Sequence, residues 1–299
     1  MRVFVTDRQP LSLPPGHRFP GEKYGLLRAR IVADGVLAES ELAEAPLATR
    51  AELLRAHRAE YVDAIFDGTI DDKRMRRIGL PWSQGLVGRA RASVGAQLQS
   101  VRAALDDGIA GALSGGTHHA HADFGAGYCV FNDIAVSALT LLAERRVARV
   151  AVIDLDVHQG DGNAAILGGD PRVYLLSLHG RNNFPFRKVP STVDVELADG
   201  TGDVEYLSAL QTALPPLFAF APEVVFYQAG VDPLAADTLG RLALTHAGLM
   251  ARDRMVLAAC RARGVPVSLS LGGGYAKPID LSVEAYVNTY RVAKSLFER

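Results

Sequence analysis

The feature that most restricts the fold is a short apolar run that ends in metal-binding side chains. Residues 150–153 read Val-Ala-Val-Ile, and Asp154, Asp156 and His158 follow at alternate positions. A largely β-branched run of this length favours a strand. Alternate residues of an extended chain point the same way, so the three side chains are predicted to face one spot. Carboxylates and imidazoles are common metal ligands, and the run therefore predicts a metal site at a strand end.

Composition narrows the classes of function. The 299 residues have a formal net charge of −1, so no overall basic field points to direct binding of nucleic acid. The chain becomes polar at residues 7–9, before a signal-peptide core could form. We find no apolar run of the ~18 residues that a membrane span needs. Two cysteines, Cys129 and Cys260, are too few for a disulfide framework. We expect a cytoplasmic protein without a membrane partner, whose oligomeric state the composition leaves open.

Strand-like and helix-like segments alternate along most of the chain. Strands are predicted at residues 1–6, 110–114, 149–154, 172–178, 224–227 and 266–271. Helices are predicted at residues 22–36, 51–66, 83–105, 133–145, 204–220, 246–263 and 281–297, with Ser83 as the cap of the third. Residues 71–77 are expected to be a charged, solvated segment. The alternation predicts an α/β fold with a mostly parallel central sheet and helices on both faces.

The sequence shows no sign of a boundary between domains. Residues 1–299 contain no internal repeat and no low-complexity linker that we can detect. We therefore predict a single domain in which the helical first third decorates or completes the sheet.

Polar and glycine-rich segments follow four of the predicted strands. These segments are Gly115–His119, Asp154–Asp161, Gln228–Gly240 and Gly272–Tyr275. Ligands of open parallel sheets bind beyond the carboxyl ends of the strands, so we expect these segments to converge on one site. Glycines allow the backbone to approach closely there.

Each segment also has a simpler interpretation. Tandem histidines are often polar loop residues, and paired aspartates cap helices as well as bind metals. Asp232 or Asp237 alone would be a turn or N-cap residue, and three glycines form tight turns as well as phosphate loops. Their joint position after successive strands favours the functional interpretation.

At this point the sequence resembles the histone deacetylase family, which has the arginase/deacetylase fold. The resemblance runs from about His17 to the C-terminus and is most specific in residues 115–133, 152–162, 228–240 and 271–275. Segments near the N-terminus, Gly16–Pro20 and Pro81–Ser83 among them, are most similar to class IV-like members and bacterial histone-deacetylase-like amidohydrolases.

The resemblance implies a metal centre and its supporting residues. The implied catalytic metal ligands are Asp156, His158 and Asp237. The ion would be Zn²⁺, although the oxygen-rich ligand set also suits Fe²⁺. Asp154 would orient His118 and Asp161 would orient His119. A structural K⁺ site would use Asp154, Asp156, His158, Ser177 and Leu178, partly through carbonyl oxygens.

The implied reaction is hydrolysis of an N-acyl amide by a metal-activated water. His119 would be the general base and later the proton donor to the amine, while His118 would adjust the electrostatics. Tyr275 would donate its hydroxyl to the developing oxyanion. The lysine stem would lie in a narrow channel formed by Tyr128, Phe184, Gly127 and Gly273. Cys129 is expected to be a packed residue and not a nucleophile.

Several positions depart from the family pattern. His121 has no family role and is expected to be a surface loop residue, and Gln159 stands where many relatives carry a second histidine. No acidic rim residue that would grip a peptide backbone can be placed in residues 71–82. Arg18 is a candidate for the product pocket behind the metal.

Three functions remain open at this level. The first is hydrolysis of acyl-lysine in proteins; the second is the same reaction on a small acylated amine such as an acetylated polyamine, which an acidic channel mouth would favour. The third is a catalytically silent metal-binding interaction module, against which the full set of ligands, histidines and tyrosine argues. An arginase-like two-metal enzyme is disfavoured, because Gly160 and Leu239 stand where its second ion would need carboxylates.

Overall fold

The computed structural model describes residues 1–9 and 11–298, and its centre is an eight-stranded sheet. The strand order is β2-β1-β3-β8-β7-β4-β5-β6. The strands are β1 (Arg2–Val5), β2 (Leu42–Glu44), β3 (Ile109–Ala112), β4 (Val150–Asp154), β5 (Val173–Gly180), β6 (Val193–Leu197), β7 (Val224–Gln228) and β8 (Val267–Ser270). Every strand pairing within the described residues is parallel, so the predicted fold class is confirmed.

All six predicted strands are present, and two edge strands were missed. β2 has only three residues, too few for a periodic signal. β6, at the other edge of the sheet, alternates half-buried and exposed residues. Its sequence, Val-Asp-Val-Glu-Leu, lacks the continuous apolar run of a central strand. Because β1 and β2 both lie in the sheet, the first third of the chain completes the sheet as predicted.

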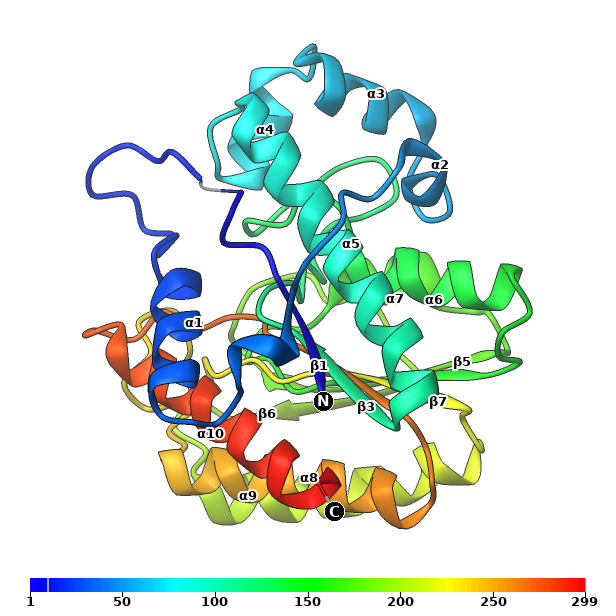
Figure 1. Cartoon of the computed structure of the whole chain (residues 1–299), viewed down its shortest axis with the longest axis vertical. Coiled ribbons are helices and arrows are strands. Elements are labelled where there is room, and N and C mark those ends of the chain that lie inside the picture. The colour runs from blue at the N-terminus through cyan, green and yellow to red at the C-terminus, as the bar shows by residue number, and fades with distance from the viewer. Residues whose placement is uncertain (10, 299) are drawn as a thin grey trace.

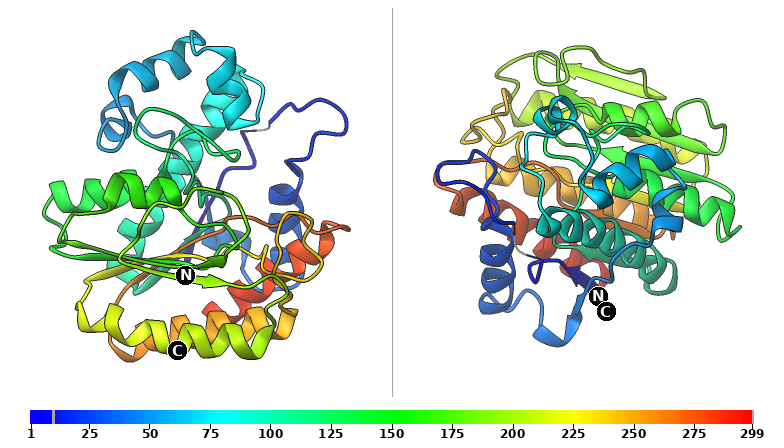
Figure 2. Two further views of the ribbon diagram at one scale, coloured as in Figure 1. Left: turned by 180° about the vertical axis from the view of Figure 1, so that it is seen from behind. Right: turned by 90° about the horizontal axis from the view of Figure 1, so that it is seen from above.

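The helices cover both faces of the sheet (Figure 1). They are α1 (Lys23–Ala33), α2 (Arg50–Leu53), α3 (Ala59–Asp67), α4 (Asp72–Ile78), α5 (Gln84–Asp107), α6 (Asp133–Ala143), α7 (Asp161–Leu167), α8 (Asp203–Ala219), α9 (His246–Ala262) and α10 (Asp280–Phe297), with a short 3-10 turn at Glu39–Glu41. Figure 2 shows the sheet between two helical layers, with α8, α9 and α10 on one side and α5, α6 and α7 on the other. Of the helices in the described residues, none is both long and apolar enough to cross a membrane.

Two hydrophobic cores result, one on each face of the sheet. Val150 and Val152 of β4 pack into the core under α5 and α6, whereas Ala151 and Ile153 pack into the core with α8, α9 and α10. Successive side chains of a strand point to opposite faces. An apolar run without alternation is therefore what a strand buried on both faces requires.

One prediction for the first third of the chain was wrong, and one helix was not predicted. The single helix predicted at residues 51–66 is interrupted between α2 and α3, where the buried ring of His57 contacts the carbonyl oxygen of His121 and the backbone N–H of Asn132. The charged segment 71–77 is solvent-exposed as predicted, but it also forms most of α4, because Asp71 caps its N-terminus and Gly79 ends it in a left-handed conformation. Its one fully buried residue, Ile78, leaves little hydrophobic periodicity to detect.

Candidate active site

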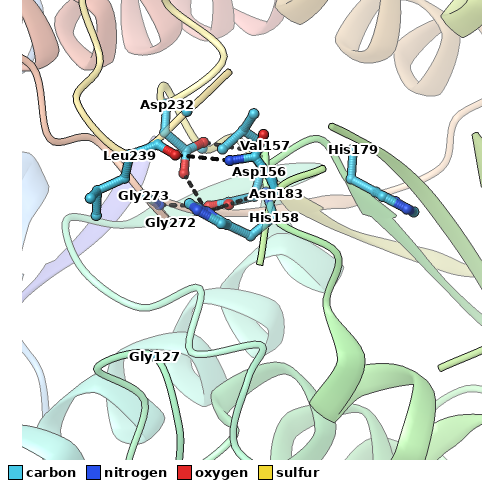
Figure 3. Close-up of polar contacts among 12 residues, drawn as sticks. Gly127, Asp156, Val157, His158, His179, Asn183, Asp232, Leu239, Gly272 and Gly273 are labelled. Atoms are coloured by element: carbon cyan, nitrogen blue, oxygen red, sulfur yellow. Dashed lines mark hydrogen bonds and ion pairs between the residues drawn. The ribbon is translucent and has the colours of Figure 1, made fainter. Parts of the chain in front are cut away.

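Three side chains converge beyond the carboxyl ends of β4 and β7. The Nδ1 atom of His158 lies 3.0 Å from an oxygen of Asp156 and 3.0 Å from an oxygen of Asp232. Ligand atoms of these three residues all lie within 4.8 Å of one another. Figure 3 shows the three side chains facing one another. The second oxygen of each carboxylate accepts a backbone N–H, from Gly273 (2.6 Å) for Asp156 and from Val157 (2.9 Å) for Asp232. One oxygen of each carboxylate and one imidazole nitrogen thus remain directed at a common point, which fits a divalent ion.

Asp237, the third ligand that the resemblance implies, stays a prediction. One oxygen of Asp237 accepts the backbone N–H groups of Leu239 (2.8 Å) and Gly240 (2.9 Å), and the other accepts that of Tyr275 (2.6 Å). Its carboxylate ties together two loops beside the Asp156–His158–Asp232 cluster. Asp232, which sequence reasoning treated only as a turn or cap residue, is a second candidate for the third ligand.

Close backbone packing explains why Asp232 reaches the cluster. A Cβ atom at Gly230 would lie 2.5 Å from a carboxylate oxygen of Asp156. Only glycine lets the chain leave β7 along Asp156, which brings the first acidic residue after the strand to His158. That position, the first carboxylate after Gln228, was the sequence signal that could have identified Asp232 as a candidate ligand.

The tandem histidines lie beside this cluster, each bonded to an aspartate. The Nδ1 atom of His118 lies 2.8 Å from an oxygen of Asp154, and Nδ1 of His119 lies 2.7 Å from an oxygen of Asp161. The two imidazole rings are 4.0 Å apart between centroids. These contacts are the pairings that the resemblance implied, and they leave Nε2 of His119 without a protein partner within the described residues.

The loop that carries the histidines is held by the first residue of α6. Asp133 accepts hydrogen bonds from the backbone N–H groups of Gly116 (2.8 Å) and Thr117 (2.8 Å) and from the Thr117 hydroxyl (2.7 Å). A buried carboxylate with this many donors fixes the loop backbone. Sequence reasoning assigned no role to Asp133.

The two histidines have opposite pKa shifts. Burial alone would lower the pKa of His118, but the carboxylates of Asp154 and Asp156 outweigh it and raise that pKa to about 9. Burial and the nearby charge of His118 lower the pKa of His119 to about 4. At neutral pH, His119 is therefore the neutral member that can accept a proton, and His118 is the charged member.

His121 is not the surface residue that was predicted. Its Nε2 atom lies 3.0 Å from the second oxygen of Asp161, and its ring stacks on Phe124 at 4.2 Å between centroids. Both oxygens of Asp161 are thus bonded to histidines, one each to His119 and His121. Burial would raise the pKa of Asp161, but these two hydrogen bonds lower it, so the carboxylate stays charged.

A cavity of about 1140 Å³ is lined by the tandem histidines, Asp156, His158 and the predicted channel residues. The ring of Phe184 lies edge-on to that of His119, with centroids 4.8 Å apart. Gly127 has a φ of +54°, and a Cβ atom there would lie 2.7 Å from the His119 ring, so the close approach needs glycine. Tyr128, Phe184, Gly127 and Gly273 all line the cavity.

Tyr275 lines the same cavity on the loop after β8. Its backbone is held by Asp237, and the hydroxyl of Tyr286 donates to the carbonyl oxygens of Gly272 (2.9 Å) and Gly273 (2.6 Å) in front of it. Burial raises the pKa of Tyr275 well above its usual value. The phenol therefore keeps its proton and remains a hydrogen-bond donor.

Two buried cations near the site were missed. Lys23, 2% exposed, places Nζ 3.3 Å and 3.4 Å from the carbonyl oxygens of Gly272 and Gly274. Arg252, fully buried on α9, donates to the carbonyl oxygen of Gly230 at 2.6 Å. Both hold backbone beside the metal-ligand cluster, and neither carries a sequence signal apart from a charge within a helix. Arg18 also lines the cavity, but it is exposed.

The remaining cysteine prediction concerns Cys129. It is 6% exposed, and burial raises the pKa of its thiol well above the usual value. A thiol that keeps its proton is a poor nucleophile, which agrees with the predicted packing role.

Comparisons with known proteins agree with this geometry. The histone deacetylase domain model matches residues 17–290. The chain is 41% identical over 286 residues to an uncharacterized protein of Picosynechococcus sp., covering 95% of each chain. It is 32% identical over 271 residues to histone deacetylase 2 of Arabidopsis thaliana, covering 87% of this chain and 70% of that one. It is also 32% identical over 294 residues to a histone deacetylase-like amidohydrolase of Pseudomonas aeruginosa, covering 91% and 74%.

A solved structure shares the fold. The crystal structure of the HDA15 HD domain superposes with a TM-score of 0.79 at 23% identity, covering 97% of this chain and 87% of that one. The chain belongs to the histone deacetylase family.

Proposed function

We propose that this protein is a metal-dependent amidohydrolase that removes the acyl group from acyl-lysine. The observation that carries the proposal is that Asp156, His158, the paired histidines and Tyr275 all line one cavity. A silent binding module would have no need for the histidine–aspartate pairs, which supports catalysis.

Asp156 and His158 would hold the catalytic ion together with a second aspartate, Asp237 as the resemblance implies or Asp232 as its contact with His158 suggests. Two carboxylates and one imidazole suit Zn²⁺, and Fe²⁺ also accepts this ligand set. When bound, the ion lowers the pKa of a coordinated water towards ~7 and polarises the acyl carbonyl. The position two residues after Asp232 is Leu234 and that after Asp237 is Leu239, so the argument against an arginase-like second ion applies to either aspartate.

The protein's own residues would move the protons. Neutral His119 accepts the proton of the attacking water at Nε2, because Asp161 already binds Nδ1 at 2.7 Å. The same proton then passes to the leaving lysine amine. Tyr275, which keeps its proton, donates to the developing oxyanion, a contribution of roughly 3 kcal/mol for donors of this kind. The charged His118 adds positive potential beside the same reacting atoms.

The channel mouth favours acyl-lysine over an acetylated polyamine. The exposed side chains that line the cavity include the cations Arg18, Arg77, Arg187 and Arg241. Of the described lining residues, the only carboxylates are Asp156 and Asp161, which belong to the catalytic site. A polycationic amine would meet repulsion at this mouth, whereas a lysine stem would pass between the rings of Tyr128 and Phe184.

A structural K⁺ ion is also proposed, on residues behind the catalytic cluster. Asp154 and Ser177 are paired in register on the adjacent strands β4 and β5. The proposed ligands are side-chain or carbonyl oxygens of Asp154, Asp156, His158, Ser177 and Leu178. Oxygen-rich sets of this kind suit hard cations.

Metal dependence of acyl-lysine hydrolysis tests the proposal. Purified protein should hold about one equivalent of divalent metal and release acetate from an acetyl-lysine peptide reporter. Chelation should abolish release, and added Zn²⁺ or Fe²⁺ should restore it. His119→Ala should lower turnover by at least 100-fold, within the ~10²–10⁴-fold usual for general acid–base groups, while metal content stays unchanged. Activity that persists in both the chelated protein and this variant would rule the mechanism out.

A further inference from the structure

The cavity extends beyond the catalytic groups to the face of α5 that packs on the N-terminal segment. We call this region the α5 lobe and define it by Phe19, Tyr24, Leu86, Arg89, Ala90 and Ser93, all of which line the cavity. A chain of contacts links it to the reacting centre: Nζ of Lys23 lies 5.1 Å from the Tyr275 ring centroid and 5.3 Å from that of Tyr24. Apart from Arg89 and Ser93, the lobe is lined by aromatic and aliphatic side chains.

Arg89 is a buried cation with an unused donor in this lobe. It is 8% exposed, and its guanidinium carbon lies 4.0 Å from the Tyr24 ring centroid. Its Nη1 atom donates to the carbonyl oxygen of Thr6 at 2.9 Å. Its Nη2 atom is buried without a hydrogen-bond partner in the described part of the chain. An unsatisfied buried donor costs ~1–3 kcal/mol, and more when the group is charged.

The charge of Arg89 is also unbalanced locally. Burial lowers the pKa of Arg89, yet a guanidinium stays protonated in proteins. The carboxylate of Asp7 acts on it electrostatically without a hydrogen bond to it: Oδ2 of Asp7 pairs with Arg28 at 3.1 Å, and Oδ1 has no hydrogen-bond partner among the described residues. Among the residues that the structure describes, no carboxylate lies within ion-pair distance of Arg89. Buried charges are normally paired, so this arrangement points to an anionic ligand.

We infer that Arg89 binds the terminal carboxylate of the acyl group, so that the preferred substrate is lysine carrying a dicarboxylic acyl chain such as glutaryl. The inference rests on the proposed function and specifies its substrate. The methylene groups would lie against the apolar wall of the α5 lobe, and the carboxylate would accept a charge-assisted hydrogen bond from the unused Nη2 donor. Hydrolysis breaks the amide C–N bond and forms a C–O bond from water; the amine takes the proton and the acid leaves as a dicarboxylate.

Reporters matched in chain length isolate the terminal carboxylate. The three peptides carry acetyl-, pentanoyl- or glutaryl-lysine, the last two differing only at the end of a five-carbon chain. For the metal-loaded wild type, we expect kcat/KM on glutaryl-lysine to exceed that on pentanoyl-lysine by about 10- to 100-fold, the range of a hydrogen bond to a charged group. Arg89→Met should remove this preference and leave the other two reporters within about twofold.

A control on the same helix separates recognition from folding. Arg91 also donates from α5 to a loop carbonyl oxygen, that of Ala48 at 2.9 Å, but it does not line the cavity. Arg91→Met should keep the glutaryl preference. Should Arg89→Met fail to fold, the wild type alone still tests the inference: glutarate should raise its melting temperature more than pentanoate does.

Distinct outcomes separate the possible failures. Equal wild-type rates on glutaryl- and pentanoyl-lysine would overturn the inference and leave the proposed function intact. An equal loss of kcat/KM on all three reporters in Arg89→Met would have the same meaning. Arg89 could instead bind the carboxylate of the released acid. In that case acetate would inhibit the wild type more strongly than Arg89→Met, and the wild type would show no preference for glutaryl-lysine. This result would assign Arg89 to product binding and overturn the substrate assignment. No hydrolysis of any reporter by metal-loaded protein would overturn the proposed function itself.

Discussion

At the scale of single residues, two aspartates of the same loop differ in their contacts. Asp232 contacts His158 at 3.0 Å, whereas Asp237 accepts backbone N–H groups, that of Tyr275 among them. Neither set of contacts is visible from residue type, because both positions are carboxylates in a glycine-containing loop. Close packing of Gly230 against Asp156 brings Asp232 to His158.

Matched variants decide which of the two aspartates binds the ion. Whichever of Asp232→Asn and Asp237→Asn removes the third ligand should lose most of the bound metal, because a carboxylate ligand becomes an amide. The other variant should keep the metal; for Asp237→Asn, kcat would then fall by about tenfold, since one weakened hydrogen bond to the Tyr275 loop costs about 1 kcal/mol or slightly more. Metal content by mass spectrometry and steady-state kinetics on acetyl-lysine distinguish the two. Full metal content in both variants would rule out both assignments.

The contact of His121 with Asp161 predicts a positioning effect on His119. His121→Ala should lower kcat by about 3- to 10-fold, the value of one hydrogen bond, with KM nearly unchanged because His121 acts through Asp161. His121→Gln should recover most of the loss, since its amide can donate from nearly the same place as Nε2. A Gln variant as slow as the Ala variant, with equal melting temperatures, would show that the hydrogen bond does not matter.

The opposite pKa shifts of the tandem histidines predict a bell-shaped pH profile. Activity needs neutral His119, so it should fall on the acid side as His119 gains a proton; burial and His118 lower that pKa to about 4. Activity should also fall on the alkaline side as His118 loses its proton near its raised pKa of about 9. Asp154→Asn removes a negative charge that holds the proton, so kcat/KM against pH should show the alkaline limb moved to lower pH. An unmoved limb would assign it to another group.

At the scale of elements, the start of α5 is set by an N-cap residue that can be recognised from the sequence. Ser83 accepts the backbone N–H of Leu86 at 3.0 Å, as a serine before an apolar-periodic segment predicts. α2 and α3 show the opposite case, because the break between them serves the distant contacts of His57 with His121 and Asn132. Helix caps depend on neighbouring residues and can be predicted from the sequence, whereas helix breaks imposed by tertiary contacts cannot.

Removing the cap should destabilise the protein without altering its chemistry. Ser83→Ala should lower the free energy of unfolding by about 1 kcal/mol, measured by urea denaturation. Ser83→Asp keeps an acceptor at the cap and should remain close to the wild type. An unfolding midpoint for Ser83→Ala equal to that of the wild type would mean that the cap contributes nothing measurable.

At the scale of the whole molecule, the parallel sheet brings together residues far apart in the chain. The carboxyl ends of β3, β4, β7 and β8 carry the histidine pair, Asp156 with His158, Asp232, and Tyr275 in turn. Because all four strands run the same way, their following loops meet at one edge. The same topology places α5 and the N-terminal segment beside that edge, where Arg89 reaches the cavity.

The amino-acid sequence by itself determined the α/β class, six of the eight strands, most helices and the strand-end segments that form the site. Each of these rests on local information: hydrophobic periodicity, caps and residue type. Only the tertiary structure showed that Asp232 contacts His158, that His121 bonds Asp161, and that Lys23 and Arg89 are buried beside Tyr24. The physical reason is that these outcomes depend on distances between side chains from different strands and helices, which no local pattern encodes.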